Sequence, residues 1–322
     1  MQPFKSISYR TVQPGPRLIV LGAVHGNETC GTRAIERLVG EIDAGSVRLA
    51  AGSLTLVPVA NPLAYSNGRR IGDRNLNRKL TPTDRPIDHE DHVANWLCPL
   101  LAAHDVLLDL HSFQSPGIPF VLIGPKDNDG PLEPFRQAAR EEALAVHLGV
   151  ARAVDGWLGT YAAGVAHRRE IAATLPAAAL DLDPRYGIGT TEYMRSAGGC
   201  ALTLECGQHA DSKAPEVAHR AILAVLAHLG LTDQPAPAPA QAVECLSLCE
   251  VVDRLDPDDA FTQAWKSFDP VRRGQTIGTR RDGTVLSAPF DGFVVFPNPL
   301  AEVGHEWFYL AAPSTRLSGR ER

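Results

Sequence analysis

The chain has 322 residues, which is enough for one large domain and a smaller one. It is 44% hydrophobic and 21% charged, as in globular proteins, and a net charge of −6 without a Lys/Arg stripe argues against nucleic-acid binding. No apolar run approaches the roughly 18 residues of a membrane span. The N-terminal segment lacks a signal-peptide pattern and the six cysteines form no C-x-x-C pair, so we expect a reducing, cytoplasmic location.

Short apolar runs alternate with longer helical patterns up to residue 231. Strands buried on both faces are predicted at residues 17–24, 53–60, 105–112, 119–124 and 200–207. Helices are predicted at residues 28–42, 90–104, 131–149 and 214–230, the last ending at a glycine cap. This alternation predicts an α/β domain over residues 1–231, with a mixed, mostly parallel sheet between helices. In such sheets, ligands bind at the carboxyl ends of the strands.

The pattern changes after residue 231. Residues 232–242, TDQPAPAPAQA, alternate Pro with Ala and predict an extended linker. Beyond it, Asp282-Gly283 and Asp291-Gly292 lie between short β-branched or aromatic runs, which is a hairpin signal. We therefore expect a small all-β domain over residues 243–322, with a frayed tail from residue 312.

Polar side chains follow three of the predicted strands. His25 and Glu28 follow the first strand, His111 ends the third, and Glu205 ends the last. Parallel strands bring their carboxyl ends to one edge of the sheet. Two histidines and one carboxylate form a catalytic zinc site when a fourth position stays open, and a further glutamate then serves as general base. His25, Glu28 and His111 fit the ligands, and Glu205 fits the base.

Each of these residues also has a structural interpretation. Glu28 could be an acid of the first helical turn, favoured by the helix dipole. His25 could be a loop histidine, and His111 a hydrogen-bonded core histidine. Glu205 is harder to explain in this way, because an unpaired carboxylate at the end of a buried strand is unfavourable.

Two further segments carry charged residues in dense groups. Residues 61–80, NPLAYSNGRRIGDRNLNRKL, could be a solvated loop, but Arg forks and Asn amides also bind carboxylates. Residues 88–92, DHEDH, could hold a second metal through Asp88, His89, Asp91 and His92. The favoured interpretation of this segment is the acidic, capped N-terminus of a helix.

Four motifs in this order resemble the succinylglutamate desuccinylase/aspartoacylase family, which belongs to the zinc-carboxypeptidase-like fold group. They are HGNE (25–28), GRRIGDRNLNR (68–78), DLHS (109–112) and TLECG (203–207). The resemblance extends from about residue 18 to 210. It implies one zinc ion per chain, with His25, Glu28 and His111 as ligands. It also implies that Glu205 is the general base and proton shuttle.

The same resemblance implies a set of substrate contacts. Arg70 matches the arginine that polarises the scissile carbonyl and stabilises the oxyanion. Asn77 and Arg78 match the pair that binds the substrate's carboxylate, and Arg195 matches a further carboxylate-binding arginine. Asp73 is expected to orient this loop through hydrogen bonds.

The sequence departs from aspartoacylases in the C-terminal segment, where those enzymes place a tyrosine that contacts the substrate. No tyrosine stands at the equivalent position of PLAEVGHEWFYLA. His305 or Tyr309 could replace it. The departure argues against strict specificity for N-acetylaspartate.

We therefore expect a zinc-dependent amidohydrolase that cleaves a small anionic N-acyl amino acid, of the N-succinyl or N-acetyl type, and that could form a homo-oligomer. Glu205 would deprotonate a metal-activated water and pass the proton to the leaving nitrogen. The alternative is a zinc carboxypeptidase for peptides, which a C-terminal domain that caps the site would disfavour. Residues 268–296 resemble biotinyl and lipoyl barrel-sandwich domains, but the turn RRDG (280–283) has no lysine to modify, which excludes a carrier role.

Overall fold

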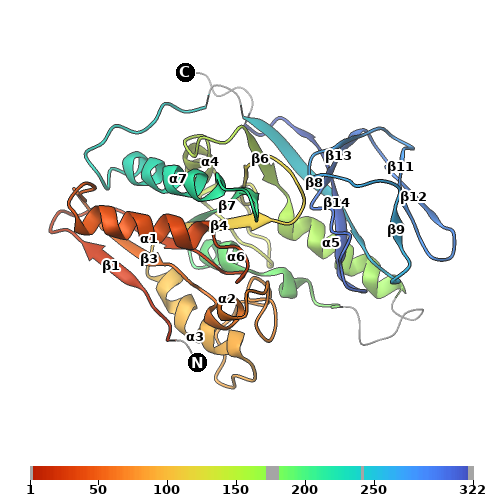
Figure 1. Ribbon diagram of the computed structural model, residues 1–322, viewed down its shortest axis with the longest axis horizontal. Coiled ribbons are helices and arrows are strands. Elements are labelled where there is room, and N and C mark those ends of the chain that lie inside the picture. Colours follow the sequence, from red (N-terminus) through yellow and green to blue (C-terminus); the bar gives the residue numbers. More distant parts are fainter. Residues whose placement is uncertain (1–2, 172–180, 241–242, 318–322) are drawn as a thin grey trace.

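The computed structural model describes residues 3–171, 181–240 and 243–317, and one large mixed sheet runs through it (Figure 1). Its eleven strands are ordered β1-β3-β2-β4-β7-β5-β6-β8-β14-β13-β10. They are β1 (Ile7–Arg10), β2 (Arg17–Leu21), β3 (Ser53–Val57), β4 (Val106–Phe113), β5 (Phe120–Leu122), β6 (Arg152–Asp155), β7 (Cys200–Gln208), β8 (Glu244–Asp253), β10 (Pro270–Val271), β13 (Gly292–Val295) and β14 (Glu306–Ser314). A second sheet contains β9 (Ala260–Phe261), β11 (Thr276–Thr279) and β12 (Val285–Ser287).

The five strands predicted before the linker are confirmed as β2, β3, β4, β5 and β7. The helices are α1 (Cys30–Asp43), α2 (Pro62–Ser66), α3 (His89–Ala102), α4 (Ala138–Ala145), α5 (Trp157–Ile171), α6 (Thr190–Ser196) and α7 (Ala214–His228), with a 3₁₀ turn η2 (Pro184–Gly187). The helix predicted over residues 131–149 is confined to α4, because Pro131 and Pro134 disfavour a helix at its start. Gly230 has φ +67°, as expected for a glycine just beyond the end of α7.

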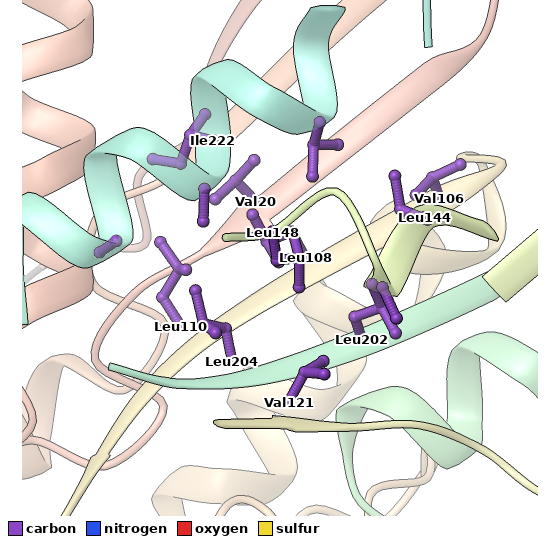
Figure 2. Close-up of a cluster of buried hydrophobic side chains, with 14 of the residues drawn as sticks. Val20, Val106, Leu108, Leu110, Val121, Leu144, Leu148, Leu202, Leu204 and Ile222 are labelled. Atoms are coloured by element: carbon purple, nitrogen blue, oxygen red, sulfur yellow. The ribbon is translucent and has the colours of Figure 1, made fainter. Parts of the chain in front are cut away.

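Strands β3, β2, β4 and β7 are parallel neighbours and form the buried centre of the molecule. Because successive side chains of a strand point to opposite faces, even-numbered residues of these strands pack against α1 and α7. Figure 2 shows Val20, Leu108 and Leu204 on that side together with Ile222 of α7. Odd-numbered residues face the other side, where α3 packs. Asp109, His111, Thr203 and Glu205 therefore share this second face.

The strands after the linker continue the large sheet. Strand β8 pairs in parallel with β6, and β14, β13 and β10 then follow in antiparallel pairs. The hairpin predicted at Asp282-Gly283 joins β11 and β12, with Gly283 at φ +87°. The hairpin predicted at Asp291-Gly292 is wrong, because the chain there leaves the small sheet and enters β13. Gly292 is required for close packing, since a Cβ atom would lie 2.3 Å from the carbonyl oxygen of Ala311.

The linker and the C-terminal tail are each described only in part. Residues 235–240 have no regular secondary structure, and the Ala240 amide donates to the Val146 carbonyl (2.9 Å). Positions 241–242 of the linker and 318–322 of the tail lie outside the described residues. The expected fraying is wrong for residues 312–316, because β14 runs to Ser314 and the Arg316 guanidinium pairs with Glu142 and Asp155 (2.8 and 3.0 Å). Among the described residues, no helix is long and apolar enough to cross a membrane.

Candidate metal centre and substrate cavity

Four predicted site residues meet at one edge of the sheet. Strands β2, β4 and β7 are neighbours, and His111 and Glu205 are register partners across β4 and β7. His25 and Glu28 lie in the turn between β2 and α1. Helix α1 begins at Cys30 after Thr29 as N-cap, so the interpretation of Glu28 as a first-turn acid is wrong.

A glycine holds the first turn against its neighbour. A Cβ atom on Gly26 would lie 2.0 Å from the carbonyl carbon of Ala64 in α2, so only glycine allows this approach. Two residues before His25, the buried Ala23 has φ +47°, an uncommon conformation for a residue with a side chain. The turn that presents His25 and Glu28 is therefore tightly constrained.

His25, Glu28 and His111 form a buried cluster whose candidate ligand atoms all lie within 4.8 Å of one another. The Glu28 carboxylate contacts the Nδ1 atoms of both histidines, His25 at 3.0 Å and His111 at 2.8 Å. His25 Nδ1 is buried and has no hydrogen bond of good geometry among the described residues. Two imidazole nitrogens and a carboxylate form a donor set that suits zinc, so these residues fit the predicted metal.

The Nε2 atoms of the same two histidines contact polar groups behind the cluster. His25 Nε2 lies 3.0 Å from Asn75 Oδ1, and His111 Nε2 lies 3.0 Å from Asp109 Oδ2. The Thr190 hydroxyl donates to Asp109 in turn. The Asn75 contact orients the His25 ring and leaves its Nδ1 for a metal, whereas His111 Nε2 contacts Asp109 without a hydrogen bond of good geometry. Sequence reasoning did not single out Asp109 and Asn75, although an acid two positions before His111 on a strand must share its face.

The close packing of these groups shifts their pKa values. Burial alone would raise the pKa of Glu28, but His25 and His111 hold it well below its usual value. Burial opposes protonation of His111, yet Asp109 and Glu28 raise its pKa well above the ordinary range. Burial lowers the pKa of His25 to about 4, with Arg70 adding to the effect. The low pKa of His25 favours the neutral imidazole that binds a metal, whereas His111 releases a proton when a metal binds.

Glu205 stands beside the cluster as a buried carboxyl group. Its Oε2 atom has no hydrogen-bond partner among the described residues. Burial raises the pKa of Glu205 to about 8. A carboxyl group with a raised pKa can hold a proton near neutral pH, which is what a proton shuttle requires.

The loop between α2 and α3 carries Arg70 to the metal cluster. Arg70 Nη1 lies 2.7 Å from Glu28 Oε1, and its side chain is half exposed. The loop is anchored by Glu90, which sequence reasoning did not single out. The fully buried Glu90 carboxylate accepts hydrogen bonds from the Asn61 amide and from three backbone N–H groups of the loop, those of Gly72, Asp73 and Arg74 (2.8–3.2 Å).

The segment 88–92 forms the start of α3, as its favoured interpretation predicts. Asp88 caps the helix by accepting from the Asp91 amide (2.7 Å), and both carboxylates bind Arg74. Asp73 accepts from the His89 amide (2.9 Å), so it ties the loop to the helix start.

Asn77 and Arg78 follow along the same loop. Asn77 Oδ1 accepts from the Thr190 backbone amide (3.0 Å), and the Asn77 backbone N–H donates to Asn75 Oδ1 (2.9 Å). The Arg78 guanidinium lies over the Trp157 ring, 4.7 Å from its centroid, and its Nη2 lies 3.1 Å from Glu306 Oε1.

Arg195 occupies a different environment from the other predicted substrate contacts. Its guanidinium is buried among Glu133, Glu141 and Glu192, with the nearest contacts at 2.8, 3.0 and 3.5 Å. It also donates to the Ala201 carbonyl (2.8 Å). These contacts satisfy much of its hydrogen-bonding capacity, and its role toward a substrate stays a prediction.

All eight predicted residues line one cavity of about 780 Å³. They are His25, Glu28, Arg70, Asn77, Arg78, His111, Arg195 and Glu205. The segment after the linker contributes further lining residues, among them Leu300, His305, Glu306 and Tyr309. A cavity of this size accommodates a small molecule.

Known proteins share the sequence pattern and the fold. Residues 14–146 match the model of the succinylglutamate desuccinylase/aspartoacylase catalytic domain. An N-alpha-acetyl-L-2,4-diaminobutyric acid deacetylase of Halomonas elongata is 33% identical over 102 residues, which are 30% of this chain and 29% of that protein.

Two solved structures illustrate the likeness in fold. The product-bound ectoine utilization protein EutE (DoeB) of Ruegeria pomeroyi matches with a TM-score of 0.69 and 21% identity, over 95% of this chain and 88% of that one. A succinylglutamate desuccinylase/aspartoacylase of Rhodobacter sphaeroides matches with a TM-score of 0.70 and 19% identity, over 97% of this chain and 90% of that one. The predicted fold class is confirmed.

Proposed function

Because the chain belongs to the succinylglutamate desuccinylase/aspartoacylase family, we propose that it is a zinc-dependent hydrolase of N-acyl amino acids. It cleaves the amide bond between a short acyl group, such as acetyl or succinyl, and the amino-acid half. The observation that carries this proposal is the buried His25–Glu28–His111 cluster with Glu205 on the neighbouring strand, inside one cavity.

The metal and the chain have separate tasks. Zinc held by His25, Glu28 and His111 would lower the pKa of a water molecule and polarise the acyl carbonyl. Glu205 takes the proton of the attacking water and delivers it to the leaving nitrogen. Arg70 stabilises the negative charge that develops on the acyl oxygen, and its position beside Glu28 supports this role.

The substrate is oriented by its carboxylate. Asn77 presents an amide nitrogen and Arg78 a guanidinium, both lining the cavity. A planar guanidinium binds a carboxylate with directional hydrogen bonds. Arg195 is a further contact for a substrate carboxylate in this proposal. That carboxylate competes with the three glutamates that already contact the Arg195 guanidinium.

We propose that residues 243–322 form a second domain that caps the cavity. Its residues Leu300, His305, Glu306 and Tyr309 line the cavity, which supports a closed site for small molecules. A closed site disfavours the alternative of a zinc carboxypeptidase that acts on peptides. Related proteins named as deacetylase and desuccinylase also support a small N-acyl amino acid. A cytoplasmic location is part of the same proposal.

The substitution Glu205→Gln tests the mechanism, with N-acetyl and N-succinyl amino acids as substrates. The amide cannot take a proton, so turnover falls by about 10²-fold or more while bound zinc, measured by elemental analysis, stays at one per chain. Glu216→Gln on the exposed side of α7 is the matched control and should keep full activity. Activity of Glu205→Gln within a few-fold of the wild type would refute the assignment of the base.

A further inference from the structure

A serine–histidine pair lies beside the metal cluster and is not used in the proposed mechanism. Ser112 Oγ lies 2.8 Å from His209 Nδ1. Ser112 follows His111 on β4, and His209 follows the end of β7, where its backbone N–H donates to the Phe113 carbonyl (3.0 Å). Both residues of the pair line the cavity. The pair is therefore held by the same two strands that carry His111 and Glu205.

The Ser112 hydroxyl determines which nitrogen of His209 carries the ring proton. Burial lowers the pKa of the His209 ring, so the ring is neutral at pH 7. Ser112 is only 3% exposed, and its hydroxyl proton has no acceptor other than His209 Nδ1 among the described residues. Because a buried donor without an acceptor is unfavourable, Ser112 donates to Nδ1. A neutral imidazole whose Nδ1 accepts a hydrogen bond carries its proton on Nε2.

His209 Nε2 is therefore a hydrogen-bond donor without a protein partner in the described part of the chain. Of the donors and acceptors of this residue, Nδ1 and the backbone N–H are already bound. The half-buried ring lines the cavity. An unpaired N–H group in the wall of a cavity is available to an acceptor atom of a ligand.

The position of the pair indicates which half of the substrate it meets. On the Nε2 side of His111, Asp109 is joined through Thr190 to Asn77. On the Nδ1 side of His111 lies Glu28, whose carboxylate also accepts from the backbone N–H of the paired serine (3.2 Å). Because Asn77 receives the carboxylate of the amino-acid half in the proposed function, the pair faces the acyl half.

The charges around His209 suit an acyl oxygen that gains negative charge. His209 interacts electrostatically with Glu28, Arg70 and His111, which are the groups around the metal site. Arg70 contacts Oε1 of Glu28, whereas Ser112 contacts Oε2, so Arg70 and the pair approach the cluster from different sides. A neutral N–H donor stabilises developing negative charge and adds no repulsion to Arg70. On this side of the site, the acyl carbonyl oxygen is the acceptor that every N-acyl amino acid presents.

We propose that His209 is a further catalytic residue, which donates from Nε2 to the acyl carbonyl oxygen, and that Ser112 is the positioning residue that fixes its tautomer. The inference rests on the proposed function and adds a second protein donor beside Arg70. As the water oxygen attacks the carbonyl carbon, an electron pair of the C=O bond moves to the oxygen, and the hydrogen bond from Nε2 strengthens while the proton stays on His209. The C–N bond then breaks, and Glu205 supplies the proton of the leaving nitrogen.

The substitutions His209→Ala and His209→Gln test the donor in the zinc-loaded enzyme. The alanine removes the N–H group, so kcat should fall by about 10²-fold for N-acetyl and N-succinyl amino acids alike, with KM changing by less than about threefold. The side-chain amide of glutamine offers an N–H group in place of Nε2–H, so His209→Gln should recover at least about tenfold of this loss. Bound zinc should stay at one per chain in both variants. His228→Gln on α7 alters a half-buried histidine outside the cavity and should keep the wild-type kcat.

The outcomes for His209 are distinguishable from those for the proposed function. A His209→Ala enzyme with kcat within about threefold of the wild type refutes the inference and leaves the proposed function standing. A loss confined to KM, or to one of the two acyl groups, shows that His209 contacts the acyl chain and also overturns the inference. If the zinc-loaded wild type hydrolyses no N-acyl amino acid, the proposed function is wrong and the inference is wrong with it.

The substitution Ser112→Ala tests the positioning role, because it keeps the backbone N–H that donates to Glu28. It should lower kcat about tenfold in the wild-type background and less than about twofold in the His209→Ala background, since the serine acts through the ring. An equal loss in both backgrounds would refute the positioning role. Nitrogen NMR of the metal-free protein, with the His209 signals assigned by His209→Gln, should show the ring proton on Nε2 in the wild type and a mixture of tautomers in Ser112→Ala. A wild-type ring proton on Nδ1 overturns the inference without any activity assay.

Discussion

Glu90 should be essential for the loop that carries Arg70 to Arg78, although it contacts neither metal nor substrate. Its carboxylate is fully buried and accepts four hydrogen bonds, two on each oxygen. In Glu90→Gln, one oxygen becomes an NH₂ group that faces two donors. Two hydrogen bonds to a charged acceptor are lost, each contributing about 1.5–3 kcal/mol, and two buried N–H groups lose their partner.

We therefore expect Glu90→Gln to lower the free energy of unfolding by about 3–6 kcal/mol, a large part of the roughly 5–15 kcal/mol of a typical domain. Urea denaturation measures this loss, and hydrogen exchange should show faster exchange of the amides of residues 72–74. Glu216→Gln, an exposed substitution of the same kind on α7, should leave the denaturation midpoint almost unchanged. A loss below about 1 kcal/mol with the amides still protected would show that Glu90 does not organise this loop.

Three further outcomes are expected. Removing the metal with a chelator should abolish hydrolysis and lower the melting temperature. Zinc at a hundredfold excess over its Kd should then raise the free energy of unfolding by about 2.7 kcal/mol. An unchanged melting temperature would contradict a metal site in the folded state. Asp109→Asn, which removes the charge behind His111, should weaken zinc binding about 10–100-fold in a competition titration, and unaltered affinity would refute the orienting role. Burial raises the pKa of Glu133 to about 7, above its unfolded value, so its contribution to stability is complete below the unfolded pKa and is lost as pH rises to 7. The free energy of unfolding of Glu133→Gln, measured by urea denaturation, should therefore rise by up to about 3 kcal/mol relative to that of the wild type between pH 4.5 and 8. A difference between the two free energies that does not change with pH would exclude this effect.

The central strands could be predicted because their sequences are apolar on both faces and end in chemically informative residues. The apolar runs before His25, His111 and Glu205 each correspond to a strand of the parallel centre. The strand-end rule then places these residues together without any knowledge of contacts. Helix α5 and strand β6 escaped prediction because their apolar residues lack clear periodicity. Helix α5, for example, carries buried Tyr161 and Arg168 among small residues.

The residues that support the site were harder to predict because their roles depend on contacts across the chain. Glu90 follows Asp88 and His89 in a segment that is also a plausible helix start, and nothing local indicates that it accepts N–H groups from residues 72–74. Asp109 could have been recognised from its spacing to His111. The prediction of the second hairpin was wrong for a similar reason. A glycine is required at position 292 because the Ala311 backbone of the neighbouring strand lies too close for a side chain, and not because the chain turns there.

The chemistry of Arg78 depends on segments that its motif does not contain. The motif NLNR places Arg78 at the cavity, but the ring beneath it belongs to α5, and the carboxylate beside it to β14, 228 residues away in sequence. Strand β14 reaches Arg78 only because β8 pairs with β6 and so joins the C-terminal strands to the large sheet. The charge environment of Arg78 is therefore set by α5 and β14 and not by its own motif.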